Sequence, residues 1–220
     1  MKTYSIILAS GKGERFGNGL PKQFFKIGDK TILEYSIEAF ENNSNIDYVV
    51  VVSNPDFIDL TQEIVKKNNY KKVIKVISGG KTRKESSFIG VNSVEETEAK
   101  ILIHDAVRPF VSERIINDCV DALDKYDAVS VAIETSDTIV SVDKNNFITA
   151  VPERQYLRRN QTPQCFKLSV IKHAHKLAIE NGLEVTDDCG LVVNLNLTPV
   201  YIVEGDNSNI KITYPSDIKI

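Results

Sequence analysis

The hydrophobic positions of the chain follow two alternating spacings. Short runs rich in β-branched residues, typical of buried strands, are separated by segments with the spacing of amphipathic helices. The predicted strands span residues 4–9, 48–53, 72–78, 99–105 and 128–134. The predicted helices span residues 32–41, 57–68, 83–94 and 112–126, and Ser112 is the expected N-cap of the last one.

This alternation of strands and helices predicts an α/β fold. Strands that are apolar at nearly every position are typical of a parallel sheet covered by helices on both faces. We therefore expect a Rossmann-like, doubly wound and mostly parallel sheet. Ligands of such sheets bind beyond the carboxyl ends of the strands, where the chain leaves for the helices.

The alternation is interrupted at about residues 137–160. Two short apolar segments flank the polar turn DKNN (143–146), and the charged segment ERQYLRRN (153–160) follows. This pattern predicts a two-stranded β-arm that projects from the sheet. Helical spacing returns at residues 168–180 and again after residue 187, and two last strands are expected in PVYIVEGD (199–206) and NIKITY (209–214).

The composition limits the number of domains and the classes of partner that we expect. A chain of 220 residues, 42% of them hydrophobic, is long enough for one sizeable core, so we expect a single domain over residues 1–220. The net charge of −3 gives no general attraction to nucleic acid or to a membrane surface. No run has the length of a signal peptide core or a membrane span, which favours a cytoplasmic protein. Cys119, Cys165 and Cys189 have no metal-ligand spacing and are expected to be reduced core residues.

The segment LASGKGERFG, which follows the first predicted strand, is rich in glycine and cationic. Its glycines miss the dinucleotide spacing GxGxxG by one residue, and Lys75 stands where the first glycine of a P-loop ending at residues 80–82 belongs. A nest of backbone N–H groups remains possible, with Arg15 and Lys22 converging on a polyphosphate. A glycine-rich turn with solvated charges is the alternative, and the loop alone does not decide between them.

Seven segments over essentially the whole chain occur in an order and spacing that resembles one family. They are LASGKGERFG with LPKQF (8–24), GGKTRKES (79–86), HDAVRPF (104–110), DTIV (137–140), QTPQCF (161–166), TDD (186–188) and EGDNSNIKIT (204–213). The sequence is similar to the cytidylyltransferases that act on methylerythritol phosphate and ribitol phosphate, which have a GT-A-like nucleotidyltransferase fold. This resemblance implies that CTP and a sugar-alcohol phosphate give a CDP-alcohol and pyrophosphate, with Mg²⁺ on the triphosphate.

The resemblance also implies a role for each matching residue. The catalytic cations would be Arg15, Lys22 and Lys211, the last also a ligand of the acceptor's phosphate. The residues that would bind CTP are Leu8, Ala9, Gly11, Gly13, Gly79, Gly80, Arg83, Ser86 and Asp105, of which Asp105 would approach the ribose or the metal. The residues that would bind the acceptor are Thr138, Thr162, Thr186 and Arg154. In this family the arm reaches a second subunit, so we expect a homodimer in which Thr138 and Arg154 act in the partner's site.

Several of these residues also have purely structural interpretations. Asp105 could cap the next turn, and the threonines could reflect strand propensity or helix capping. His104 precedes Asp105, but an ionised phosphate acceptor needs no general base. His173 and His175 lie two positions apart on a predicted helix, so we expect surface residues on different faces rather than metal ligands.

The acceptor is the least determined part of the prediction. The methylerythritol branch typically carries Lys or Arg after the DT pair, whereas this chain has Ile139, Val140 and Ser141, which favours D-ribitol 5-phosphate and the product CDP-ribitol for teichoic acid or capsule synthesis. Methylerythritol phosphate, another polyol phosphate, or a catalytically idle sugar-nucleotide-binding module are the alternatives. The segment ERQYLRRN departs from the smaller polar residues usual in the arm. The sequence ends at SDIKI, where a last helix would continue, as expected for part of a longer polypeptide.

Overall fold

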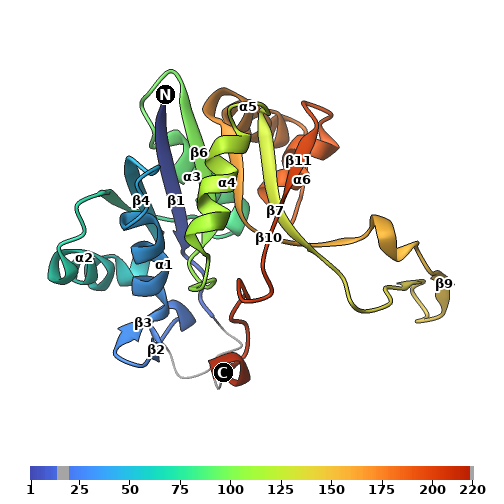
Figure 1. Cartoon of the computed structure of the whole chain (residues 1–220), viewed down its shortest axis with the longest axis horizontal. Helices are drawn as coiled ribbons and strands as arrows, with labels where there is room; N and C mark the ends of the chain where they lie inside the picture. The colour runs from blue at the N-terminus through green and yellow to red at the C-terminus, as the bar shows by residue number, and fades with distance from the viewer. Residues whose placement is uncertain (14–19, 219–220) are drawn as a thin grey trace.

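The computed structural model of the chain describes residues 1–13 and 20–218 and contains a central seven-stranded sheet (Figure 1). The strands are β1 (Lys2–Ala9), β4 (Tyr48–Ser53), β5 (Val73–Ser78), β6 (Ala99–Asp105), β7 (Ala128–Glu134), β10 (Arg158–Lys167) and β11 (Val200–Glu204). Their order across the sheet is β11-β7-β10-β6-β1-β4-β5. Neighbouring strands are parallel except that β10 is antiparallel to both β6 and β7. The predicted α/β fold with a mostly parallel sheet is confirmed.

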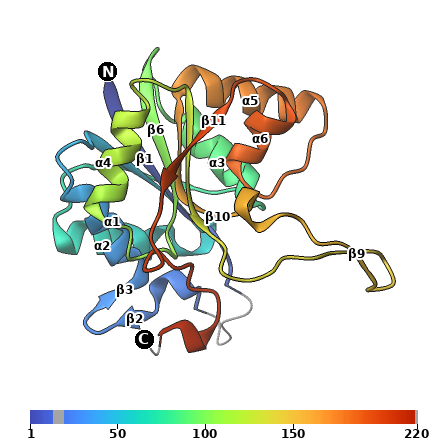
Figure 2. The same ribbon diagram turned by 45° about the vertical axis from the view of Figure 1, so that its right-hand side comes forward.

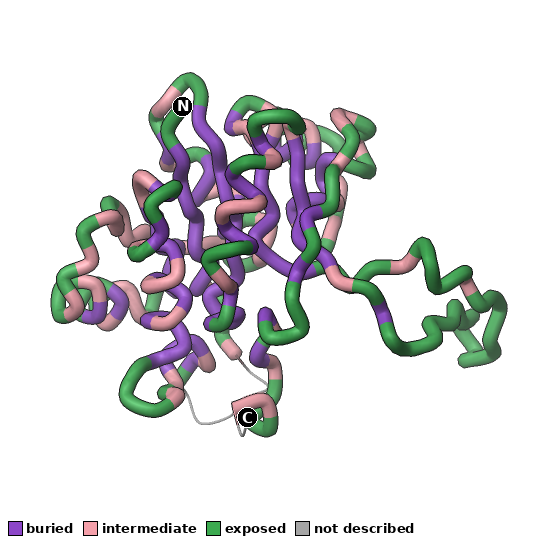
Figure 3. The backbone as a smooth tube through the Cα atoms, in the orientation of Figure 1, coloured by how far each residue is buried: buried purple, intermediate pink, exposed green. Residues whose placement is uncertain are grey.

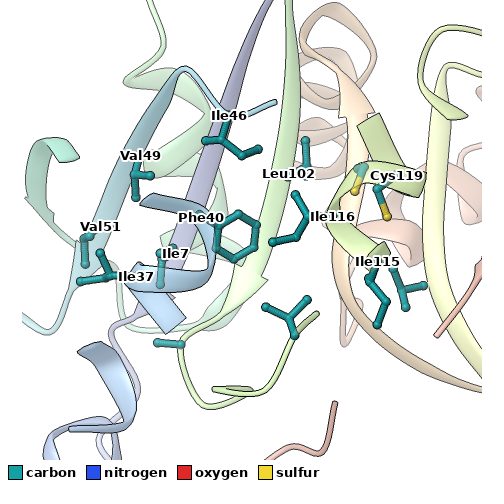
Figure 4. Close-up of a cluster of buried hydrophobic side chains, with 14 of the residues drawn as sticks. Ile7, Ile37, Phe40, Ile46, Val49, Val51, Leu102, Ile115, Ile116 and Cys119 are labelled. Atoms are coloured by element: carbon teal, nitrogen blue, oxygen red, sulfur yellow. The ribbon is translucent and has the colours of Figure 1, made fainter. Parts of the chain in front are cut away.

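Helices cover both faces of this sheet. On one face lie α1 (Ile32–Glu41), α2 (Ile58–Asn68) and α4 (Glu113–Ala122); on the other lie α3 (Arg83–Asn92), α5 (Leu168–Glu180) and α6 (Asp188–Asn194). Figure 4 shows the first of these two core layers, in which Ile37 and Phe40 of α1 face Ile7 of β1 and Ile116 of α4. The apolar positions that recur every three or four residues are therefore the ones that pack on the sheet.

Local sequence signals determine where the helices begin. Thr31 caps α1 through a capping box, because its side chain accepts a hydrogen bond from the N–H of Glu34 while the Glu34 carboxylate accepts one from the N–H of Thr31. Ser112 caps α4 as predicted, accepting from the N–H of Ile115. The remaining short elements are β2 (Lys26–Ile27), β3 (Lys30–Thr31) and 3₁₀ turns at Lys22–Phe24, Pro55–Phe57, Arg154–Tyr156 and Pro215–Ile218.

Two parts of the C-terminal third differ from the prediction. The strand β10 was not predicted, because Pro163 within QTPQCF argues against a central strand. The structure accommodates this proline where the register with β7 shifts, between Asn160 and Gln164. The prediction of a strand at residues 209–214 is wrong, because the segment is a loop. The buried side chain of Ile212 packs this loop against Ile32 and Val107.

The predicted arm is present and projects from the body of the molecule (Figure 2). It contains the two-stranded ribbon of β8 (Ser141–Val142) and β9 (Ile148–Ala150). Most of the sheet is buried, whereas the arm is exposed along nearly its whole length (Figure 3). Phe147 is 70% exposed and Tyr156 is 78% exposed.

The three cysteines are buried free thiols, which confirms that they are core residues. Over residues 1–13 and 20–218, no helix combines the length and the apolar character needed to cross a membrane.

Candidate active site

A pocket opens at the carboxyl ends of β1, β4, β5 and β6, and the described residues enclose a volume of about 800 Å³. The chain runs from β1 outward through β4 to β5 and then returns to β6 on the other side of β1. The loops that follow β1 and β6 therefore diverge, and this is where doubly wound sheets bind their ligands. The pocket has the size of a small-molecule site.

The loop after β1 forms one wall of the pocket. Its backbone is held by the buried side chain of Gln23, whose Nε2 donates hydrogen bonds to the carbonyl oxygens of Ala9 at 2.6 Å and Gly11 at 3.0 Å. Gly13 has a φ of +67°, and a Cβ there would lie 2.8 Å from the backbone nitrogen of Lys22. Only glycine fits this position. Arg15, the first predicted catalytic cation, lies outside the described residues.

The loop after β5 forms a second wall, which adjoins the loop after β1, and its two glycines are packed too closely for side chains. A Cβ at Gly79 would lie 2.5 Å from Cβ of Ser10, and one at Gly80 would lie 2.4 Å from Cβ of Glu85. The Gly80 N–H donates to Ser86 Oγ at 3.1 Å, and Ser86 Oγ lies 2.7 Å from Ser10 Oγ. The two loops are thus joined behind the pocket, and the backbone of residues 79–80 is free to approach a ligand.

A row of alternating charges crosses the pocket at the end of β6. Asp105 is 7% exposed and accepts hydrogen bonds from Arg83 Nε at 3.1 Å and from Lys211 Nζ at 2.7 Å. Arg83 Nη1 also donates to Asp188 at 2.7 Å. Burial alone would raise the pKa of Asp105, but the positive charges of Arg83 and Lys211 hold it well below its ordinary value. Asp105 is therefore an ionised carboxylate that orients two cations.

The two predicted catalytic lysines meet at the loop that precedes the C-terminal turn. The buried Ile212 fixes this loop, and its N–H donates to the carbonyl of Val107 at 2.9 Å. Lys211, the neighbouring residue, reaches Asp105, while Lys22 Nζ donates to the carbonyl of Ile212 at 2.8 Å. Lys22 and Lys211 both line the pocket, although they are 189 positions apart in the sequence.

Thr162 lies beneath this row of charges and does not line the pocket. Its hydroxyl is buried, accepts from the N–H of Asp105 at 3.1 Å and lies 2.9 Å from His104 Nδ1. The other ring nitrogen of His104 donates to the carbonyl of Arg108 at 3.0 Å, so Nδ1 is the acceptor for Thr162. Burial lowers the pKa of His104 to about 4, so the ring is neutral and serves to position the end of β6.

The other predicted acceptor residues lie outside this pocket. Thr186 is exposed and lines a small neighbouring hollow together with Arg83 and Asp188. Thr138 and Arg154 lie on the arm, where Arg154 Nη1 donates to the carbonyl of Ser136 at 3.1 Å. Figure 2 shows the arm projecting sideways from the body of the molecule, from between β7 and β10. Of the residues predicted to bind the acceptor, only Lys211 lines this pocket among the described residues, whereas Thr138, Arg154, Thr162 and Thr186 do not.

The expectation that His175 is a surface residue is wrong. Its side chain is 1% exposed and faces α3 and α6, whereas His173 is exposed as expected. The helical spacing contained the signal, because His175 continues the buried series of Ile171, Ala174 and Ala178 at every third or fourth residue. Other pocket residues were missed, among them Gln23 and Asn54: Gln23 lies within the LPKQF segment, but nothing in the sequence marks the hydrogen bonds of these two amides to backbone carbonyls.

The fold and the pocket define a nucleotidyltransferase, with glycine loops after β1 and β5 next to the charged end of β6. The family model described as IspD, 2-C-methyl-D-erythritol 4-phosphate cytidylyltransferase, matches residues 3–220. The chain belongs to this IspD family of cytidylyltransferases.

Two similar proteins have different printed names. The chain is 42% identical over 224 residues to the 2-C-methyl-D-erythritol 4-phosphate cytidylyltransferase of Thermobifida fusca, which covers 98% of this chain and 90% of that protein. It is 41% identical over 223 residues to the bifunctional ribulose 5-phosphate reductase/CDP-ribitol pyrophosphorylase Bcs1 of Haemophilus influenzae. That match covers 100% of this chain but 47% of the relative, so the chain spans about half of the bifunctional protein.

Solved structures are similar over the whole chain. The 4-diphosphocytidyl-2C-methyl-D-erythritol synthase of Anaerococcus prevotii superposes with a TM-score of 0.88 at 30% identity, covering 99% of this chain and 93% of that one. The bifunctional IspDF of Campylobacter jejuni superposes with a TM-score of 0.78 at 25% identity, covering 100% of this chain and 54% of that one.

Proposed function

We propose that this cytidylyltransferase converts CTP and D-ribitol 5-phosphate into CDP-ribitol and pyrophosphate, for the synthesis of a surface polymer such as teichoic acid or capsule. The observation that carries the choice of acceptor is the arm: the resemblance implies Lys or Arg after the DT pair in the methylerythritol branch, and this chain has Ile139, Val140 and Ser141 after Thr138. The 41% identity, over the whole chain, to a protein named as a CDP-ribitol pyrophosphorylase agrees with this choice.

The charged residues of the pocket fit this reaction. A phosphate oxygen of the acceptor attacks the α-phosphorus of CTP, a new P–O bond forms, and the bond to the β-phosphate breaks as pyrophosphate leaves with its electron pair. The acceptor is already ionised, so the step needs neither a protein nucleophile nor a general base. Negative charge that grows on the transferred group and the leaving group would be stabilised by Lys22 and Lys211, with Arg15 in the family position of the third cation.

The two glycine loops would hold the nucleotide. The backbone around Gly11 and Gly13 would contact the triphosphate, and the backbone around Gly79 and Gly80 would contact the cytosine. Side chains fix the backbone of both loops. Gln23 donates a hydrogen bond to the first loop, and Ser86 accepts one from the N–H of Gly80 in the second. A base larger than cytosine would meet this close-packed wall, which favours CTP over purine nucleotides.

Mg²⁺ is part of the proposal as a companion of the triphosphate. The described residues include no group of three or more His, Cys, Asp or Glu that could hold a metal ion by themselves. Asp105 lines the pocket as an ionised carboxylate, and one carboxylate combined with phosphate oxygens is a common Mg²⁺ environment. The residues therefore fit a metal held chiefly by the nucleotide, where it would neutralise charge on the phosphates.

The acceptor half of the site would come from a second copy of the chain. Thr138 and Arg154 lie on the exposed arm, and a two-stranded ribbon of this length is not stable by itself in water. Exposed apolar side chains of the arm, among them Phe147 and Ile148, need a covering surface. We infer a C₂ homodimer in which each arm brings its threonine and arginine to the partner's pocket.

Methylerythritol phosphate remains the second candidate acceptor, because the family model and the Thermobifida fusca relative carry that name. Pyrophosphate release from CTP and Mg²⁺, measured with ribitol 5-phosphate, methylerythritol 4-phosphate and glycerol 3-phosphate, separates the candidates. We expect the highest kcat/KM with ribitol 5-phosphate. Release with methylerythritol 4-phosphate alone would overturn the proposed acceptor, and no release with any acceptor would indicate an idle nucleotide-binding module.

A further inference from the structure

A buried polar network adjoins Arg83 at the nucleotide pocket. Asp188, in the first turn of α6, is 1% exposed, and its Oδ2 accepts a hydrogen bond from Arg83 Nη1 at 2.7 Å. Its Oδ1 accepts a hydrogen bond from the hydroxyl of Ser87 on α3. Ser87 Oγ lies 3.2 Å from Nε2 of His175 on α5. Three helices thus each place a fully buried polar side chain in one network.

The hydrogen bonds of this network run in one direction. An ionised carboxylate only accepts, so Ser87 donates its hydroxyl proton to Asp188 and has a lone pair left for the histidine. The nitrogen of His175 that faces Ser87 is therefore the protonated one, Nε2. Burial lowers the pKa of His175, so the ring is neutral, and the order is His175 to Ser87 to Asp188.

The geometry of Ser87 differs from that of its neighbour. Ser86 donates to the carbonyl of Thr82 at 2.8 Å, four residues earlier in the chain, as serines within helices commonly do. Ser87 has the carbonyl of Arg83 at the same spacing but donates to Asp188 instead. The ring of His175 is itself oriented by an edge contact with Phe88, with 5.8 Å between ring centroids.

The position of the Arg83 guanidinium depends on two carboxylates. Asp105 is shared between Arg83 and Lys211. Within the described parts of the chain, Arg83 is the one lysine or arginine that pairs with Asp188. Asp188 is therefore the more selective anchor of Arg83, and its own orientation depends on the hydrogen bond from Ser87 and on the nearby ring of His175.

We propose that His175 and Ser87 are positioning residues for nucleotide binding, because they fix the Asp188 carboxylate and through it the Arg83 guanidinium that lines the pocket. This inference rests on the proposed use of CTP, and it holds for any acceptor. Removal of the histidine donor frees Ser87 to turn to the carbonyl of Arg83, and Asp188 then loses a hydrogen bond. Affinity for the nucleotide falls, while Lys22 and Lys211 still carry the chemical step.

Direct binding of CTP tests the inference without an acceptor. We would measure Kd for CTP with Mg²⁺ by calorimetry for the full chain and for three variants. His175→Leu removes the donor at similar volume, His175→Gln keeps an N–H donor, and His173→Leu is the matched control on the exposed side of α5. We expect His175→Leu to weaken binding by about five- to tenfold. His175→Gln should restore Kd to within about twofold, and the control should bind as the wild type does.

A double-mutant cycle shows whether His175 acts through Arg83. In an Arg83→Gln background, His175→Leu should change Kd by less than about twofold, because the group that it positions is gone. A general loss of packing would instead weaken binding equally in both backgrounds. Ser87→Ala provides the same cycle with the loss of one hydroxyl group, should His175→Leu fail to fold as judged by circular dichroism.

The outcomes separate this inference from the proposed function. Wild-type protein that does not bind CTP would contradict the nucleotide assignment and the inference together. Wild-type protein that binds CTP, with an unchanged Kd in His175→Leu and Ser87→Ala, would overturn the inference alone. An equal loss of affinity with and without Arg83 would overturn it as well.

Discussion

The nucleotide pocket and the arm are constructed in opposite ways. Around the pocket charged side chains are joined to one another within the same chain, as in the row that contains Lys211, Asp105, Arg83 and Asp188. On the arm the apolar side chains face solvent, and residues 137–151 are all exposed. The charged side chains of the pocket are thus held by hydrogen bonds within one chain, whereas the arm exposes apolar side chains such as Phe147 and Ile148.

From this difference we infer how the two halves of the proposed reaction are divided between the pocket and the arm. A triphosphate needs donors that are fixed in advance, since preorganised charge stabilises a transition state without reorganisation. One chain brings such donors together at the pocket, with Lys22 in the 3₁₀ turn Lys22–Phe24 and Lys211 on the loop before the C-terminal turn. The arm that carries Thr138 and Arg154 leaves the sheet between β7 and β10, and neither residue lines the pocket of its own chain.

The largest expected effect compares two phenylalanines. Phe166 of β10 is 0% exposed in the core, whereas Phe147 of the arm is 70% exposed. Phe166→Ala should lower the free energy of unfolding by about 3–5 kcal/mol, because it leaves a cavity. Phe147→Ala should change it by less than about 0.5 kcal/mol at high dilution. Urea unfolding measures both.

Unfolding measured at several protein concentrations distinguishes the two phenylalanine variants further. If a second copy covers the arm, the effect of Phe147→Ala on unfolding should grow as the protein concentration rises. The effect of Phe166→Ala on the free energy of unfolding of one chain should not depend on protein concentration. A loss of more than about 1 kcal/mol for Phe147→Ala at high dilution would show that the arm packs on its own body.

Acid should weaken the body of the molecule through His104. Its pKa is lowered to about 4 by burial, whereas the unfolded imidazole titrates near its ordinary value of 6.5. Between these pH values the unfolded state binds more protons, so stability falls as the pH falls, by about 3 kcal/mol from this group. Unfolding measured from pH 7 to pH 4 should show a shallower fall for His104→Asn than for the wild type.

The exposed His173 provides the control for the acid effect. His173→Asn should leave the pH dependence of the unfolding free energy as it is in the wild type. If His104→Asn retains the full wild-type slope, the acid sensitivity belongs to other groups, and His104 is not held neutral by its burial.

Substitution of Lys22 tests whether the pocket is the catalytic site. If this ammonium group neutralises charge that develops during transfer, Lys22→Ala should lower kcat by about a hundredfold or more, with a smaller change in CTP affinity. Steady-state pyrophosphate release and CTP binding measure the two effects separately. Lys26→Ala, which removes an exposed lysine four residues further on, is the matched control. Near-normal turnover of Lys22→Ala would remove this residue from the mechanism.

The sequence could predict the parallel part of the fold because each of its strands is a separate apolar run. It could not predict β10, whose polar residues and Pro163 resemble a loop until β6 and β7 enclose them. Residues 209–214 alternate like a strand, but the burial of Ile212 in a small separate cluster holds them as a loop. In both cases tertiary contacts overrode the local pattern.

The site shows the same limit. The edge of the sheet and the residues Lys22, Asp105 and Lys211 could be predicted, because motifs mark them. The link between Arg83 and Asp188 could not, since it joins residues 105 positions apart and depends on how α6 meets α3. The burial of His175 could have been predicted from helical spacing alone, had the full series from Ile171 to Ala178 been considered.

The smallest expected effect is a partial recovery of activity when two inactive variants are mixed, which tests whether the arm contributes to a shared site. Arg154→Ala on the arm and Lys22→Ala in the pocket should each be inactive as pure proteins. In a mixed dimer with sites shared between chains, one site carries both lesions and the other carries neither. Random exchange of subunits makes half of the dimers mixed, so the mixture should recover roughly a quarter of wild-type activity. If Arg154 serves its own chain, every site keeps one lesion, and a mixture that stays inactive after exchange has been verified with differently tagged subunits would overturn the shared site.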